Sequence, residues 1–198
     1  MNHTYKRLQV LLCFGLICLV FSCKSNDTAM SSNSTLAFSE LETLLEKEDY
    51  YIEMESAIPF NTLATTQVIN SLMLRNTGNN ASRIDLSGDG NFIEIKNDSI
   101  KGYLPFFGEQ RISSGRYGGT DTAIQFEGLA KDYEKSIIDK KKKLEIEFTT
   151  NHKGDNSERY DVRLEIFPNK RVMVSITPTY RTIMRYSGRL KPIKDKSQ

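Results

Sequence analysis

The sequence LEIEF, residues 144–148, alternates apolar and acidic side chains with a period of two. Successive side chains of a β-strand point to opposite faces, so this stretch predicts a strand with one buried and one solvated face. The same alternation returns at residues 162–166 (VRLEI) and 172–176 (VMVSI). Such repetition is typical of an antiparallel sheet that packs on a core through one face. We therefore predict an α+β fold, predominantly an antiparallel β-sheet that is curved or sandwich-like, with an N-terminal helix.

Turn residues between the alternating stretches predict that the strands follow one another as a meander. Asp89-Gly90 favours a tight hairpin before a strand at 92–96, and Asn97-Asp98 favours another before a strand at 99–104. Further turns are expected at 151–157, 168–170 and 177–179, the last of them before a strand at 181–190.

Two other segments carry signals of their own. Ser39-Glu40-Leu41-Glu42 matches a capping box, and leucines follow at helical spacing, which predicts a short amphipathic helix at about 39–48. Residues 65–74 fit either a second helix or a strand. Residues 105–119 hold four glycines and one proline, and this composition predicts a long loop.

The start of the chain has the pattern of a bacterial lipoprotein signal. Lys6 and Arg7 precede an uncharged apolar run at 8–21, which is shorter than a membrane-spanning helix and typical of a signal peptide. The run ends in Val20-Phe21-Ser22-Cys23, which resembles a lipobox. We expect cleavage before Cys23 and lipidation of its sulfur, because Val20-Phe21-Ser22 fits the small-residue A-x-A pattern of a conventional cleavage site poorly. The alternatives are an ordinary cysteine after a conventional site and an uncleaved anchor.

This interpretation divides the chain into four parts and predicts where the protein resides. The parts are a signal peptide at 1–22, a flexible tether at 23–36, one β-rich domain at 37–193 and a polar tail at 194–198. Lys24 follows the cysteine where an Asp would favour the inner membrane. We therefore expect a protein held on the outer membrane by its lipid, facing the periplasm or the cell surface.

The expected domain has few of the side chains that most often carry catalysis. Cys13 and Cys18 lie in the leader and Cys23 is the expected lipidation site, so the domain would have no thiol and no disulfide. His3 would leave with the leader, and His152 would remain alone in a polar loop. Zinc sites built from His and Cys are thereby excluded, and the sequence predicts no cofactor.

The charge balance argues against a protein that binds nucleic acids. The chain has 27 Lys and Arg residues, of which Lys6 and Arg7 belong to the leader, against 25 Asp and Glu residues. The remaining chain would carry no net charge. A nucleic-acid partner is not expected, because its recognition needs a concentrated basic surface.

Short motifs between Tyr51 and Leu190 carry a family resemblance. The most specific is YLPFFG at 103–108. The others are IEMESA at 52–57 with Pro59, NDSI at 97–100, YGG at 117–119, FEG at 126–128, Arg181 and YSG at 186–188. Together they resemble the bacterial envelope lipoproteins of the domain of unknown function 4251 family. The resemblance implies an anchored β-rich domain of unknown activity, and it brings no catalytic residues.

Two charged motifs could be binding sites, but a simple turn explains each of them better. Asp85, Ser87 and Asp89 stand where a calcium loop has ligands, but Lys96 stands where its bidentate Glu should be, so a hairpin turn is favoured. Residues 140–143 are four consecutive lysines that could touch anionic headgroups. Because acidic residues flank them, we expect a solvated hairpin turn.

The loop that begins at Tyr103 is the candidate binding site. Its aromatic rings offer stacking area and its arginines offer forked hydrogen-bond donors. The candidate residues are Tyr103, Phe106, Phe107, Arg111, Arg116 and Tyr117. The alternative is that Phe106 and Phe107 close one end of the core.

The sequence supports two classes of function, without a motif that decides between them. The first is a non-enzymatic module that binds an envelope protein, a glycan or another ligand. The second is a carboxylate-based hydrolase of envelope or dietary glycans, since paired carboxylates need no local motif. Thr28, in Asp27-Thr28-Ala29 of the tether, is a weak candidate for O-glycosylation.

Overall fold

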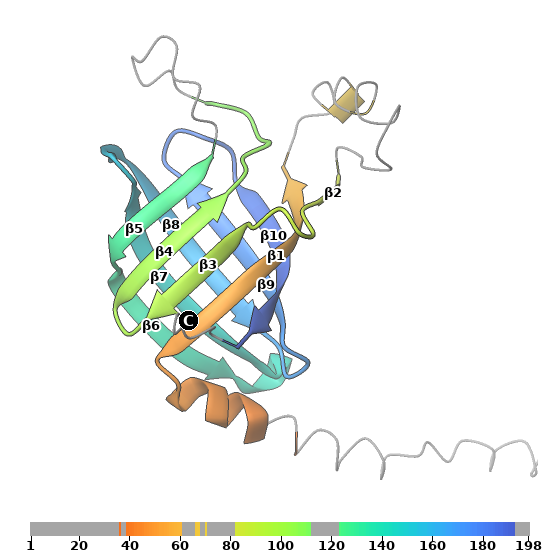
Figure 1. The fold of residues 1–198 in the computed structure, drawn as a ribbon, viewed down its shortest axis with the longest axis vertical. Helices are drawn as coiled ribbons and strands as arrows, with labels where there is room; N and C mark the ends of the chain where they lie inside the picture. Colours follow the sequence, from red (N-terminus) through yellow and green to blue (C-terminus); the bar gives the residue numbers. More distant parts are fainter. Residues whose placement is uncertain are drawn as a thin grey trace, which may run out of the picture. The chain divides into compact units, whose positions relative to one another are not determined.

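The computed structural model describes residues 36, 39–60, 66–67, 70, 82–111 and 123–192. The chain divides into two compact units, residues 1–36 and 37–198. Apart from residue 36, all the described residues belong to the second unit, which contains the β-sheet shown in Figure 1.

A single antiparallel sheet dominates this unit, which confirms the predicted fold class. Its strands are β1 (Asp49–Pro59), β2 (Ile84–Asp85), β3 (Phe92–Lys96), β4 (Ser99–Leu104), β5 (Ile124–Leu129), β6 (Lys131–Ile138), β7 (Lys143–His152), β8 (Asp155–Ile166), β9 (Arg171–Pro178) and β10 (Met184–Lys191). The strand order is β5-β4-β3-β1-β10-β9-β8-β7-β6, with β2 paired to β1. Most neighbours are consecutive in the chain, as in a meander, and the pairing of β1 with β10 joins the two halves.

The sheet is strongly curved, and its two outermost strands are adjacent in sequence. β5 and β6 are separated only by Ala130, so one continuous segment leaves one edge and reaches the other. β5 also approaches the end of β7 without a ladder between them: the amide of Lys153, in the turn after β7, donates to the Gln125 carbonyl over 2.8 Å, and the sheet is not closed. Figure 1 shows β4 and β5 in front of β7 and β8.

The concave face of the sheet holds the core, as the alternation predicts. Leu144, Ile146 and Phe148 are buried, whereas Glu145 and Glu147 between them are only half-buried. Aromatic rings fill the space between opposite parts of the sheet. Phe126 of β5 meets Phe148 of β7 edge to face, with ring centroids 6.1 Å apart. The core is thus packed with side chains contributed from both halves of the sheet.

A helix at 39–46 covers one end of the sheet, which confirms the helix predicted at about 39–48. Leu41 and Leu44 are buried, so the apolar stripe faces the core. The Tyr50 hydroxyl donates to the Leu44 carbonyl at 2.6 Å and lies 2.8 Å from the Lys47 carbonyl, which ties the helix to β1. Residues 66, 67 and 70 are helical, and the rest of the predicted segment at 65–74 lies outside the described residues.

The prediction of a hairpin at Asp89-Gly90 is wrong. β2 and β3 do not pair with each other; both pair with the same side of β1, one beyond the other. Residues 86–91 therefore connect two segments along one edge of β1. Gly88 and Gly90 have φ values of +84° and +74°, which glycine adopts easily. The glycines do form a turn, but the turn connects β2 to β3 along β1 and does not form a hairpin.

Other predicted turns have mixed outcomes. Asn97-Asp98 and residues 168–170 are hairpin turns, as expected. The polar loop predicted at 151–157 is mostly strand, because β7 continues to His152 and β8 begins at Asp155. The turn is reduced to 153–154, where Gly154 has a φ of +81°. The last strand begins at Met184, three residues later than predicted.

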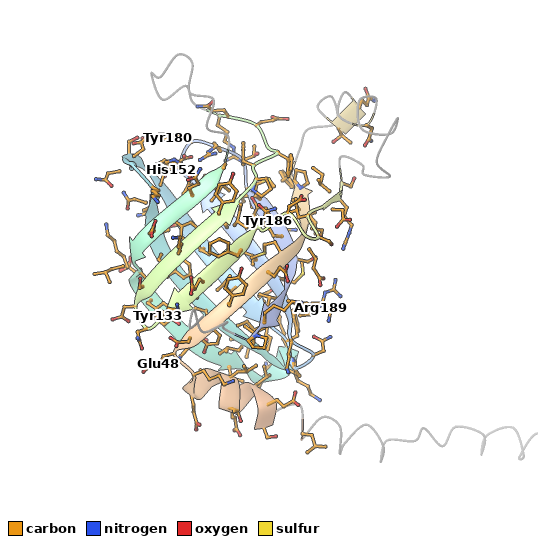
Figure 2. All side chains as sticks on the ribbon, in the orientation of Figure 1. Glu48, Tyr133, His152, Tyr180, Tyr186 and Arg189 are labelled. Carbon is orange, nitrogen blue, oxygen red and sulfur yellow. The ribbon has the colours of Figure 1, made fainter. Side chains whose placement is uncertain are left out.

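The strand directions define two ends of the sheet. We call the first the loop end: residues 105–111, the β7–β8 turn at 153–154 and residues 179–183. We call the opposite one the helix end: the helix at 39–46 and the turns at 97–98, 139–142 and 167–170. His152 and Tyr180 lie at the loop end and Glu48 and Tyr133 at the helix end (Figure 2).

Candidate functional site

The predicted binding loop begins at the loop end of β4. Tyr103 lies on the outer face of β4 with 47% of its surface exposed. Phe106 and Phe107 are half-buried and pack against the core, and Arg111 is exposed. The structure therefore brings these four residues to one end of the sheet. Two further predicted site residues, Arg116 and Tyr117, lie outside the described residues.

The first part of the loop is fastened to the segment before β10. The Arg111 amide donates to the Tyr180 carbonyl over 2.7 Å, and the Thr182 amide donates to the Glu109 carbonyl over 2.9 Å. The Glu109 amide also donates to the Thr182 hydroxyl at 2.9 Å. Gly108 permits this approach, because a Cβ there would lie 2.2 Å from the Thr182 hydroxyl oxygen.

A buried ion pair lies directly beneath the loop. Arg181 holds both carboxylate oxygens of Glu158, with Nε 2.8 Å from Oε1 and Nη2 2.5 Å from Oε2. Only 8% of Arg181 and 9% of Glu158 are exposed. On its other side, the Arg181 guanidinium carbon lies 4.9 Å from the centre of the Phe106 ring, a cation–π contact. The ion pair thus supports the aromatic part of the loop from below.

Further hydrogen bonds connect the ion pair to a tyrosine and a histidine, and a second tyrosine bonds to the loop. Arg181 Nη2 donates to the Tyr160 hydroxyl over 2.6 Å, and Nδ1 of His152 lies 2.7 Å from the same hydroxyl. The hydroxyl of the buried Tyr186 donates to the Pro105 carbonyl over 2.8 Å. We name Glu158, Arg181, Tyr160 and His152 the polar network. His152 therefore lies at the end of a strand and belongs to this network, which corrects its predicted place in a polar loop.

Burial and partners set the protonation of this region. Burial raises the pKa of the Tyr160 hydroxyl well above its usual value, so this phenol keeps its proton at neutral pH. Burial also raises the pKa of Tyr186. For Arg181, burial disfavours the charge, but the hydrogen bonds to Glu158 and the neighbouring Tyr160 outweigh it and raise the pKa. The pair is therefore a fixed cation held against a carboxylate.

Sequence reasoning missed the polar network, although one signal was present. The alternation at 162–166 extends backwards, so that Tyr160 and Glu158 fall on the same face as Val162. An acidic residue at an inward position of a strand demands a buried cation or donor as its partner. Arg181 supplies this cation from the segment before β10, which no local pattern could have revealed.

The two charged motifs considered at first have different outcomes. Asp85 accepts hydrogen bonds from the amide and hydroxyl of Ser87, at 3.1 and 2.7 Å, and these bonds lower its pKa. This is a local turn interaction. In the lysine run, residues 140–142 are exposed, but Lys143 is only 2% exposed and pairs with Glu145 at 2.5 Å and with Glu165. The solvated turn predicted for the whole run therefore ends at Lys142.

The network has the character of a structural support. Each charged group in it already has a close partner, and the phenol is held in its neutral form. Among the described residues, no group of three or more His, Cys, Asp or Glu side chains could hold a metal ion. What the loop end presents outward is an ordered loop segment with Arg111 exposed on it.

The comparisons with known proteins identify the family. A model described as "Domain of unknown function (DUF4251)" matches residues 32–190. The chain therefore belongs to the domain of unknown function 4251 family, as its motifs suggested. Searches of curated proteins and of solved structures found no match. Within the described residues, no helix is both long and apolar enough to cross a membrane.

Proposed function

We propose that this protein is a lipid-anchored protein of the cell envelope that binds a ligand or partner protein without catalysing a reaction. In this proposal the binding surface is the loop end of the sheet. The observation that carries it is the way residues 105–111 are held. The backbone of this segment is bonded to residues 180–182, and its Phe106 ring rests on the buried Arg181.

Rigid support matters for binding because a loop that is already ordered loses little entropy when a partner arrives. Phe107 is half-buried, Tyr103 is exposed on β4, and Arg111 is exposed at the end of the described segment. Aromatic and arginine side chains are the residue types that contribute most at interfaces. A fixed segment bearing these side chains is therefore suited to recognition.

The chemistry of the network favours binding over hydrolysis. A carboxylate-based glycosidase uses two carboxyl groups that face each other across the scissile bond. The groups that face Glu158 are a guanidinium and a phenol, at 2.5–3.3 Å. Both oxygens of this carboxylate are already engaged by the Arg181 guanidinium, so neither faces a second carboxyl group across a substrate. The hydrolase alternative has no such support at this end of the sheet.

The anchor is proposed from the sequence pattern at Cys23, and it has its own test. Changing Cys23 to Ser should move the protein from the membrane fraction to the soluble fraction, because diacylglycerol is the expected attachment. The outer membrane is the expected location. A Cys23→Ser protein that stays with the membranes after a high-salt wash, which screens electrostatic attachment, would contradict the lipid anchor and leave the binding surface untouched.

Binding at the loop end is tested by capture from native membranes. The lipidated wild-type protein and the variants Arg111→Ala and Arg163→Ala would be used as baits, with bound proteins and glycans quantified by mass spectrometry. Arg163 is a matched control, since it is an exposed arginine on β8 that pairs with Glu147. We expect Arg111→Ala to lose captured material that Arg163→Ala retains. Equal capture by both variants would contradict the proposed surface.

A further inference from the structure

Five exposed cations gather at the helix end. Lys140, Lys141 and Lys142 form the turn between β6 and β7, and all three are exposed. Lys170 ends the turn between β8 and β9, and Arg171 begins β9; both are exposed as well. We call these five residues the basic turns. They come from parts of the chain about thirty residues apart, so only the fold brings them together.

The two turns enclose a shared hollow. Leu144 at the start of β7 pairs with Ile166 at the end of β8, which makes the turns neighbours. Between them lies an open hollow of about 590 Å³. Its cationic lining comes from Lys141, Lys142 and Arg171, and its apolar lining includes Phe167, Pro168 and Met173. A hollow lined by both cationic and apolar side chains suits a ligand in which an anionic group is attached to an apolar group.

No close ion pair neutralises the basic turns, although the exposed Asp139 begins the same turn as the lysines and Lys141 adds to Lys143 in lowering the pKa of Glu145. In the part of the chain that the structure describes, none of these five side chains has a carboxylate partner within 4.0 Å. Lys101, Lys153 and Arg163 elsewhere on the sheet each pair with a glutamate. A local positive field thus remains on a chain whose expected mature form has no net charge.

The position of this field relative to the chain start suggests its partner. The helix at 39–46 belongs to the same end as the basic turns, and only fifteen residues lie between Cys23 and the start of that helix. A tether of the kind that the sequence predicts at 23–36 has a mean span of about 20 Å over this length. If Cys23 carries the lipid, as proposed above, the helix end is the part of the domain held next to the membrane surface.

We infer that the basic turns dock on the membrane, with the phosphates of anionic lipid headgroups as their ligands. Each lysine or arginine near an anionic bilayer strengthens binding about fivefold. The helix bears the exposed acids Glu40, Glu42 and Glu46. Anionic lipids repel these acids, so the domain should tilt until the basic turns, and not the helix, meet the headgroups. This inference rests on the proposed lipid anchor for the orientation of the domain, because the anchor would keep this end close to the bilayer.

The test measures vesicle binding of the mature chain without its lipid, residues 24–198, so that the anchor does not contribute. The vesicles are phosphatidylglycerol mixed with phosphatidylcholine, or phosphatidylcholine alone, and binding is read by co-sedimentation. The variant Lys141→Gln/Lys142→Gln/Arg171→Gln should bind the anionic vesicles on the order of 100-fold more weakly than wild type. The control Lys101→Gln/Lys153→Gln/Arg159→Gln removes the same charge elsewhere, and it should lose less than threefold.

Two results would overturn the inference. They are wild-type protein that does not bind anionic vesicles, and a control variant that loses as much binding as the basic-turn variant. Because the unlipidated chain is used, the result is independent of the Cys23→Ser fractionation and of capture at the loop end.

Discussion

The two ends of the sheet handle charge in opposite ways. At the loop end, Arg181 and Glu158 are buried against each other beneath aromatic rings. At the helix end, the basic turns keep their cations exposed and unpaired within the described chain. A buried pair fixes geometry, because breaking it leaves an uncompensated charge in the interior. An exposed cluster costs little in stability and creates a field. The first arrangement shapes a loop, and the second attracts a surface.

Alkaline pH should have the largest effect, because it acts on buried phenols at both ends. Burial raises the pKa of Tyr160 and Tyr186 above the ordinary 10.0. Below pH 10 the folded and unfolded states both keep these protons, so stability does not change. Above pH 10 the unfolded state releases them first, and stability falls as the pH rises. Tyrosinate absorbance and circular dichroism, recorded on wild type and Tyr186→Phe, should show that Tyr186 ionises only as the sheet unfolds.

The helix end provides the comparison for this titration. Burial raises the pKa of Tyr133 to about 12, with further contributions from Asp98 and Glu48. It should therefore also ionise late. If Tyr160 or Tyr186 titrated near pH 10 while the sheet stayed intact, the loop end would be open to water, contrary to this account.

Removing one partner of the buried ion pair should have the next largest effect. Arg181→Ala leaves the Glu158 carboxylate buried without its cation, and we expect a loss of about 3–5 kcal/mol in the free energy of unfolding. Lys141→Ala at the helix end should change it by less than about 0.5 kcal/mol. Urea denaturation measures both. A double variant Glu158→Leu/Arg181→Leu that recovers most of the loss would confirm that the unpaired charge is the cause.

Substitutions of Phe106 test whether the contact between its ring and Arg181 stabilises the loop. Truncation to Ala removes a half-buried ring that covers Arg181, and we expect a loss of about 2 kcal/mol, less than for a fully buried phenylalanine. Phe106→Leu keeps the apolar contact and should lose less. Thermal unfolding of the two variants separates packing from the cation–π contact. No change in Phe106→Ala would show that the ring does not support the loop.

The sequence predicted the parts of the fold that follow local rules. Residues 144–148 are a strand because alternation and burial agree there. β6 escaped prediction, since none of its residues is fully buried and its outward and inward positions look alike. The loop before β3 was misassigned because glycine turns do not reveal which strands they connect. At the site, Glu158 was readable from its inward register, but its partner Arg181 lies 23 residues away and was found only in the structure.

The most direct test of the loop end as a binding surface is site-specific photo-crosslinking in intact cells. A photoreactive amino acid would replace Arg111 in one strain and Arg163 in another, since both are exposed arginines on different parts of the sheet. Replacing Arg111 should change stability by less than about 0.5 kcal/mol, so the probe reports contact and not unfolding. We expect discrete crosslinked species from position 111 and none of them from position 163. Identical products at both positions, or none at position 111, would contradict the account.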